Sequence, residues 1–178
     1  MSGGALERVK EYPLSDGDIR KILGDDIKIF TYPQLKGLRT ADQMFDGKGR
    51  CIILYLTEGP NVGHWCCLMK RGNTIDFFDP YGDSPEEVKD GIPKSKMEML
   101  DMDSPYLTRL LKGSGRQVYY NTHPYQKQRG DINTCGRHCV TRLLYAPLPE
   151  DKYYKVVQSS GLSPDDFVSG MTFGMLRK

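Results

Sequence analysis

The sequence lacks several features that would assign a function class at once. No apolar run approaches the roughly 20 residues that a membrane-spanning helix needs, and the amino terminus lacks the basic and apolar regions of a signal peptide. The net charge is only +2, from 25 basic and 23 acidic residues, so charge alone does not indicate a nucleic-acid-binding protein. No internal repeat or low-complexity segment stands out. We therefore expect a protein that works inside a cell and has no membrane partner.

The cysteine pattern also lacks the features of a disulfide framework. The chain has five cysteines, an odd number at irregular positions, which is unlike the framework of a secreted disulfide-rich domain and indicates a reducing compartment. The side chains that could ligate a metal are His64, Cys66, Cys67, Cys135, His138 and Cys139. No pair of them has the Cys-x2-Cys spacing of a zinc knuckle, and adjacent Cys66 and Cys67 point to opposite faces of a strand. The sequence therefore predicts no metal site.

The chain has enough length and apolar content for one packed domain. Its 178 residues are 38% hydrophobic and 27% charged, values typical of a soluble globular protein. We expect a single domain over residues 1–178. Residues 1–13 begin with small and polar side chains, so they are expected to form a loose N-terminal segment.

The pattern of apolar residues predicts an α+β fold with a central mixed sheet flanked by helices. Residues 51–56 form a continuous apolar run of strand length, and after a turn at 58–61 the segments 62–69 and 74–78 return as two further strands. Further strands are expected near residues 27–32 and 116–120. Helices are expected after Ser15, near residues 86–89 and 106–111, from Cys135, over residues 152–157 and after Ser163.

The cysteine at position 135 stands at a predicted helix start. A polar loop ends at Thr134, and the apolar residues that follow Gly136 have helical spacing. Unpaired amides and the dipole at a helix N-terminus favour an anion, so a thiol placed there ionises more readily and becomes a better nucleophile. The alternative is a buried cysteine that only packs, which is the commoner fate of a free thiol. The segment by itself leaves both interpretations open.

A histidine and an aspartate are predicted to meet at one edge of the sheet. His64 lies at the start of one strand of a hairpin, and Asp79 follows the end of the next strand, so both belong to the same sheet edge. Each has an ordinary alternative, because a histidine beside Trp65 is often structural and an Asp-Pro pair is often only a turn. A cysteine, a histidine and a polar group that orients the histidine are the parts of a thiol protease.

Three separated motifs, spanning roughly residues 50–145, carry a family resemblance. Gly-His-Trp at 63–65, Phe-Asp-Pro-Tyr-Gly at 78–82, and Gln128 seven positions before Cys135-Gly136 resemble the catalytic signature of the adenovirus-type maturation proteases (adenain). The wider clan also contains proteases that process ubiquitin-like modifiers. The resemblance implies a papain-like but permuted cysteine protease fold. Adenovirus proteases have glutamate at the acid position, so Asp79 is closer to the cellular modifier proteases.

The resemblance implies a role for each residue of these motifs. Cys135 would be the nucleophile, His64 the general base and later acid, and Asp79 the group that orients the imidazole. Gln128 would donate its side-chain amide to the oxyanion beside the backbone amide of Cys135. Gln126 is the alternative donor. The expected substrate cleft includes Gly63, Trp65 and Gly136, although Trp65 could equally be a core residue.

The function that these roles imply is a cysteine endopeptidase that cleaves viral structural precursors during particle maturation. The alternatives are a protease that removes ubiquitin or SUMO-type modifiers and a catalytically silent relative that binds a protein partner. We expect a monomer in the host cytoplasm or viral factory that is also packaged in the virion. Adenovirus proteases are assisted by a peptide and by DNA, but the sequence requires no cofactor and has no clear peptide-tethering cysteine. The residues that could form a basic DNA-binding surface are Arg109, Lys112, Arg116, Lys127 and Arg129.

Overall fold

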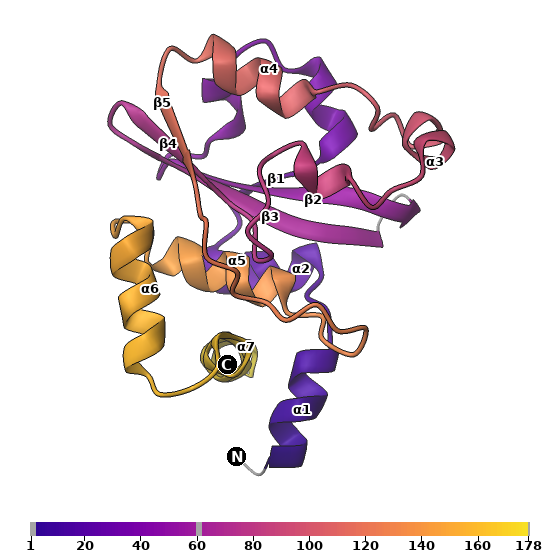
Figure 1. The fold of residues 1–178 in the computed structure, drawn as a ribbon. Helices are drawn as coiled ribbons and strands as arrows, with labels where there is room; N and C mark the ends of the chain where they lie inside the picture. Colours follow the sequence, from indigo (N-terminus) through magenta and orange to yellow (C-terminus); the bar gives the residue numbers. More distant parts are fainter. Residues whose placement is uncertain (1–2, 60–61, 178) are drawn as a thin grey trace.

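A five-stranded mixed sheet forms the centre of the computed structural model, which describes residues 3–59 and 62–177 (Figure 1). The strand order is β1-β2-β3-β4-β5; β3 is antiparallel to its neighbours β2 and β4, and the outer strands β1 and β5 are parallel to their neighbours. The strands are β1 Lys28–Thr31, β2 Arg50–Gly59, β3 Val62–Arg71, β4 Thr74–Phe78 and β5 Gln117–Tyr120. The helices are α1 Gly3–Glu11, α2 Asp16–Leu23, α3 Lys94–Met99, α4 Tyr106–Gly113, α5 Cys135–Leu144, α6 Glu150–Ser159 and α7 Pro164–Leu176.

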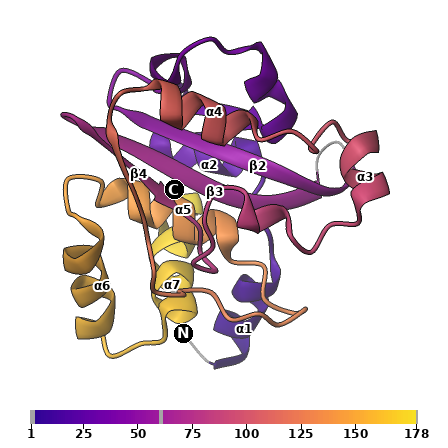
Figure 2. The ribbon, with the colours of Figure 1, turned by 45° about the horizontal axis from the view of Figure 1, so that its top comes forward.

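Helices cover both faces of this sheet, so the predicted α+β class is confirmed. Helix α5 lies between β3 and α7 on one side, while α4 packs with the short 3-10 segments at 32–37 and 41–44 on the other (Figures 1 and 2). The expected β-meander is present, with the hydrophobic run of β2 buried from Arg50 to Leu56. Burial of each large aliphatic side chain there contributes roughly 1.5–3 kcal/mol. Helix α3 was not predicted, and residues 60–61 of the expected turn lie outside the described residues.

The pairing of β2 with β3 brings the backbone unusually close at Gly63. This residue pairs with Leu56, and a Cβ added to it would lie 1.8 Å from the carbonyl oxygen of Tyr55. Only glycine permits such an approach. Because Tyr55 in turn pairs with His64, this contact sets the position of the histidine at the edge of the sheet.

Helix α5 is buried almost all round. Every residue from Cys135 to Leu143 is buried, because β3 covers one side of the helix and α7 the other. Arg142 is among the buried residues, and its guanidinium donates to the carbonyl oxygens of Tyr145 and Leu148 at 3.0 and 2.7 Å. A buried cation needs such partners. The first residue of α5, Cys135, therefore has its position set by the packed centre of the molecule.

The prediction of a loose N-terminal segment is wrong for residues 3–11, which form α1. The Lys10 ammonium is buried and pairs with Glu7 at 2.6 Å and with Asp166 of α7 at 3.0 Å. The Lys10 carbonyl also accepts from the amide of Asn133 at 2.8 Å. Asn133 and Asp166 lie more than 120 residues along the chain from Lys10, so a local pattern could not reveal these two contacts. Within the described ranges, no helix is long and apolar enough to cross a bilayer.

Candidate active site

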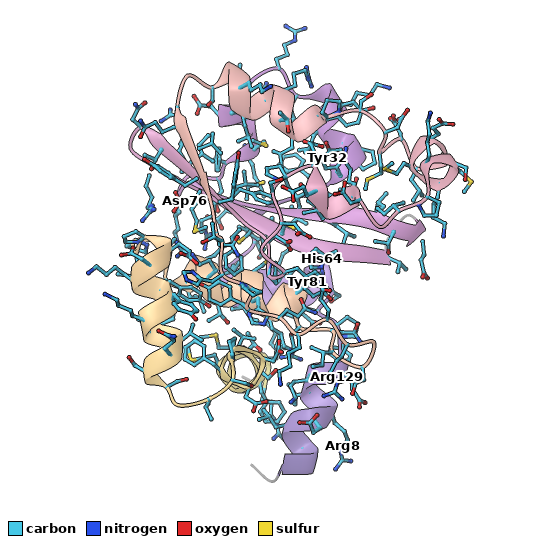
Figure 3. The ribbon with its side chains drawn as sticks, in the orientation of Figure 1. Arg8, Tyr32, His64, Asp76, Tyr81 and Arg129 are labelled. Carbon is cyan, nitrogen blue, oxygen red and sulfur yellow. The ribbon has the colours of Figure 1, made fainter. Side chains whose placement is uncertain are left out.

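Three elements bring the predicted cysteine, histidine and aspartate to one point. Cys135 is the first residue of α5, His64 is the third residue of β3, and Asp79 directly follows β4. Figure 3 shows His64 and Tyr81 beside the N-terminal end of α5. The hairpin of β3 and β4 supplies two of the groups, and the helix packed against β3 supplies the third.

The imidazole of His64 is held by a buried carboxylate and by a stacked ring. Its Nε2 lies 2.5 Å from Oδ1 of Asp79, and Asp79 is fully buried. The ring of Tyr81 stacks on the imidazole with centroids 4.8 Å apart and planes 8° apart. Because Nε2 is engaged by Asp79, Nδ1 is the ring nitrogen left to exchange a proton with a thiol.

Asp79 is itself fixed by neighbouring amides. Its Oδ1 accepts from the amide of Tyr81 at 3.2 Å, and its Oδ2 accepts from the amide of Asp83 at 2.9 Å. The side chain of Asn121 accepts from the Asp79 amide at 2.9 Å and donates to the Asp79 carbonyl at 2.7 Å. The carboxylate therefore has little freedom to turn away from His64. Sequence reasoning missed Asn121, which carries no motif signal and comes from the segment after β5.

The thiol of Cys135 is paired with His64. Burial raises the pKa of Cys135, but the hydrogen bond and charge of His64, with the amides of Trp65 and Gly136, lower it below the usual value overall. The amide of Trp65 donates to Sγ at 3.5 Å. Burial lowers the pKa of His64, while its hydrogen bonds to Asp79 and Cys135 raise it to about 10. The lowered pKa of Cys135 and the raised pKa of His64 both favour a thiolate paired with an imidazolium.

This ion pair predicts how thiol labelling depends on pH. Alkylation of Cys135 by iodoacetamide should already be fast at pH values where an ordinary thiol is protonated, because a lowered pKa leaves more thiolate at each pH. In His64→Ala the imidazolium is lost while burial still raises the pKa of the thiol, so the midpoint of the rate should move to higher pH. Peptide mass spectrometry across pH measures both rates. Equal midpoints in the two proteins would rule out the pairing.

The two candidate glutamines have different surroundings. Gln126 is buried, and its Nε2 donates to the carbonyl oxygen of Ile132 at 3.2 Å. Gln128 is exposed on the same loop, seven residues before Cys135. The structure thus brings Cys135, His64 and Asp79 together and leaves the Gln128 side chain at the surface of the loop that leads into α5.

Two hollows adjoin the site. One, of about 730 Å³, is lined by Leu14, Gly63 and Trp65 among others, and the second, of about 410 Å³, is lined by His64, Asp79 and neighbouring residues. Trp65 is buried and donates through Nε1 to the carbonyl oxygen of Leu14 at 3.1 Å, so it both packs and forms a wall of the first hollow.

Gly136, the third predicted cleft residue, lies beneath that wall. A Cβ added at this position would approach the Leu14 Cβ at 3.0 Å and the Trp65 Cδ1 at 3.1 Å. The second position of α5 is therefore too crowded for a side chain unless Leu14 or Trp65 shifts. Glycine here lets the helix start sit close against the indole.

A group of possible metal ligands overlaps this site. Donor atoms of His64, Cys66 and Asp79 lie within 4.8 Å of one another, and the Cys66 thiol lies 3.6 Å from Asp79 Oδ1. Burial raises the pKa of Cys66 well above its usual value, so its thiol stays protonated and is a poor ligand. Two of the three donors are already bonded to each other as the His64–Asp79 pair. The group therefore fits an acid–base pair with a neutral thiol beside it.

The other histidines and the basic residues lie elsewhere. His138 is buried in α5 with Nε2 2.9 Å from Asp165 Oδ1, and His123 pairs with Glu150 at 2.9 Å.

The basic residues that could bind DNA do not form a single surface patch. Residues 109–116 belong to α4 and the segment after it, across the sheet from α5, whereas the loop with Arg129 lies on the α5 side near α1 (Figures 1 and 3).

Comparison with known proteins shows similarity to a virophage protein and weaker likeness to solved structures, two of which are described below. No protein-family model matches the chain. The uncharacterized protein V9 of the Sputnik virophage is 36% identical over 172 residues, which cover 94% of this chain and 98% of that protein. The central domain of Lpg1148 from Legionella pneumophila has a TM-score of 0.45 at 19% identity, covering 93% of this chain and 99% of that one. The C-terminal Ulp1 protease domain, solved with Smt3, the yeast orthologue of SUMO, has a TM-score of 0.41 at 15% identity, covering 96% and 81%.

Proposed function

The chain belongs to the family of protein V9 of the Sputnik virophage, and we propose that it is a cysteine endopeptidase that cleaves viral structural precursor proteins during particle maturation. The observation that carries this proposal is the pairing of Cys135, at the start of a buried helix, with His64, whose other ring nitrogen bonds to buried Asp79. A thiolate, an imidazolium and an orienting carboxylate in this order are the groups that acyl transfer needs. The virophage relative and the resemblance to adenain support a viral substrate.

The mechanism follows from these positions. The Cys135 thiolate attacks the scissile carbonyl carbon, the carbon–sulfur bond forms, and the carbonyl electron pair moves onto oxygen. The backbone amide of Cys135 and the side chain of Gln128 stabilise that oxyanion. The His64 imidazolium gives its proton to the leaving amine as the peptide bond breaks. His64 then takes a proton from water, which attacks the thioester and releases the acid and the thiolate.

The two glutamines give a test of the oxyanion assignment. Gln128→Ala should lower turnover by about 10²–10³-fold, the usual effect of losing one oxyanion donor, and should leave thermal stability unchanged because the side chain is exposed. Gln126→Ala should instead lower stability by about 1–3 kcal/mol, because it removes a buried side chain bonded to the Ile132 carbonyl. Initial rates and thermal melts of both variants decide it. The opposite pattern would assign the oxyanion role to Gln126.

Coexpression with each structural protein of the same viral genome tests the substrate. A precursor should be shortened by the wild-type protein and stay whole with Cys135→Ala. DNA and basic peptides are added in separate arms, because the resemblance implies such activators. Precursor cleavage would be contradicted if every precursor stayed whole while Cys135 of the same protein preparation was still labelled rapidly.

Removal of a ubiquitin-like modifier is the second candidate, favoured by aspartate rather than glutamate at position 79. Modifiers that carry a C-terminal electrophile should then form an adduct on Cys135. If every modifier tested failed to react while iodoacetamide reacted, this alternative would be excluded. Full biological function of Cys135→Ala would instead favour a catalytically silent binding protein.

A further inference from the structure

The buried carboxylate of Asp165 joins the start of α7 to both ends of the loop that precedes α5. Asp165 is only 2% exposed. Its Oδ1 accepts from the Thr134 hydroxyl at 2.7 Å and from His138 Nε2 at 2.9 Å, and its Oδ2 accepts from the Lys127 amide at 3.1 Å. One side chain therefore binds three groups that are separated by up to 11 positions in the sequence.

Two of these groups are the chain neighbours of the candidate oxyanion donors. Lys127 directly precedes Gln128, and Thr134 directly precedes Cys135, whose backbone amide is the second donor. A donor acts on an oxyanion only if it already points at the developing charge, and displacement by about 1 Å can cost 10²-fold in rate. Fixing the Lys127 amide and the Thr134 hydroxyl to one carboxylate fixes the distance between the two ends of the loop.

The start of α7 suits an ionised carboxylate in this place. Asp165 lies in the first turn of the helix, where the dipole favours negative charge, and Ser163 caps the helix by accepting from the Asp166 amide. Burial raises the pKa of Asp165, but the hydrogen bonds of His138, Thr134 and Lys127 keep it below the usual value. All three partners are donors, so the two acceptor oxygens of a carboxylate match them. An asparagine would place an NH₂ group against one of these donors.

We propose that Asp165 is a positioning residue for the oxyanion hole. Its carboxylate holds the loop over residues 127–134 so that Gln128 and the Cys135 amide face the same oxygen. This inference rests on the proposed function. It gives α7, a helix that contributes no group to the thiol–imidazole pair, an effect on acyl transfer that acts through the loop before α5.

The test compares Asp165→Asn with Asp166→Asn, its matched control. Asp166 is the next residue on the same helix, but its carboxylate pairs with Lys10 and makes no contact with the loop partners of Asp165. Two probes are used. Turnover of p-nitrophenyl acetate passes through a tetrahedral oxyanion, whereas alkylation by iodoacetamide is a displacement at carbon that needs only the Cys135 thiolate.

For Asp165→Asn we expect ester turnover to fall by about 10–100-fold, while the alkylation rate stays within about threefold of wild type. Asp166→Asn should stay within about twofold in both assays, since it leaves the contacts of Asp165 with the loop in place. Adding Asp165→Asn to Gln128→Ala should lower turnover by less than the product of the two single losses, because part of the Asp165→Asn loss comes from displacing the Gln128 donor that the other change already removes. Hydrogen exchange of the loop over residues 127–134 should be faster in Asp165→Asn than in Asp166→Asn.

Three results would overturn the proposal: equal losses of ester turnover and alkylation in Asp165→Asn, no loss in either assay, or full additivity with Gln128→Ala. Should Asp165→Asn fail to fold, Thr134→Val removes one of the three donors, and the same selective loss of ester turnover is then required. Failure of the proposed function looks different, because wild type would then turn over the ester no faster than Cys135→Ala. The hydrogen-exchange comparison would still report whether Asp165 holds the loop.

Discussion

Replacing Cys135 with alanine is expected to lower peptide hydrolysis by about 10⁴-fold or more while leaving the fold intact. The thiols of Cys51, Cys66 and Cys139 are not expected to take over, because burial raises their pKa values above the usual range. Cys135 is 8% exposed at the start of α5, whereas these three thiols are fully buried. Initial rates of precursor cleavage, with thermal melts of the same preparations, measure the effect.

Cys139→Ala is the matched control for this loss. It removes another buried thiol from the same helix, one turn after Cys135. The backbone carbonyl of Cys139 accepts from the Cys67 thiol of β3 at 3.8 Å, a contact that the substitution leaves in place. We expect its turnover to stay near that of wild type, with a loss of about 1 kcal/mol in the free energy of unfolding. Equal turnover of Cys135→Ala and wild type would show that the hydrolysis comes from another source.

Asp79→Asn is expected to lower turnover by roughly 10³–10⁴-fold, the scale seen when a triad carboxylate is replaced by its amide. The carboxylate accepts from His64 Nε2 and so fixes which ring nitrogen carries the proton. In one orientation an amide places its NH₂ group against the ring and the Tyr81 amide, and in the other it places that group against the Asp83 amide. The measurement is turnover and KM, and the loss should fall on turnover.

The pH profile of Asp79→Asn should change in a defined direction. The hydrogen bond and charge of Asp79 raise the pKa of His64, which stands at about 10, so removing the charge lowers it. The imidazolium then loses its proton at lower pH, and the alkaline limb of residual activity should move downward. The control is Asp83→Asn. Asp83 is half-buried and hydrogen-bonds Asp79 through its backbone amide, which the substitution keeps, so activity should stay within about threefold of wild type. If both variants lost the same activity, Asp79 would have no special role.

The sequence by itself determined the parts of this protein that depend on short segments. The apolar run at 51–56 and the segments that return after it dictated three adjacent strands, because local hydrophobic periodicity and turn residues are sufficient to form a meander. The same hairpin geometry placed His64 and Asp79 at one edge, since paired strands bring their facing ends together. The position of Cys135 at a helix start was also readable, because the change from polar loop to helical spacing is local.

Only the tertiary structure decided how distant segments converge on that edge. Three contacts each join residues 30 or more positions apart in the sequence. Lys10 of α1 pairs with Asp166, Asn121 binds the backbone of Asp79, and Asp165 binds Thr134 in the loop before α5. The exposure of Gln128 and the burial of Gln126 likewise follow from the path of that loop. Periodicity and spacing report which face of its own element a residue occupies. They carry no information about which remote element covers that face, because the packing partner of each element is set by the free energy of the whole folded chain.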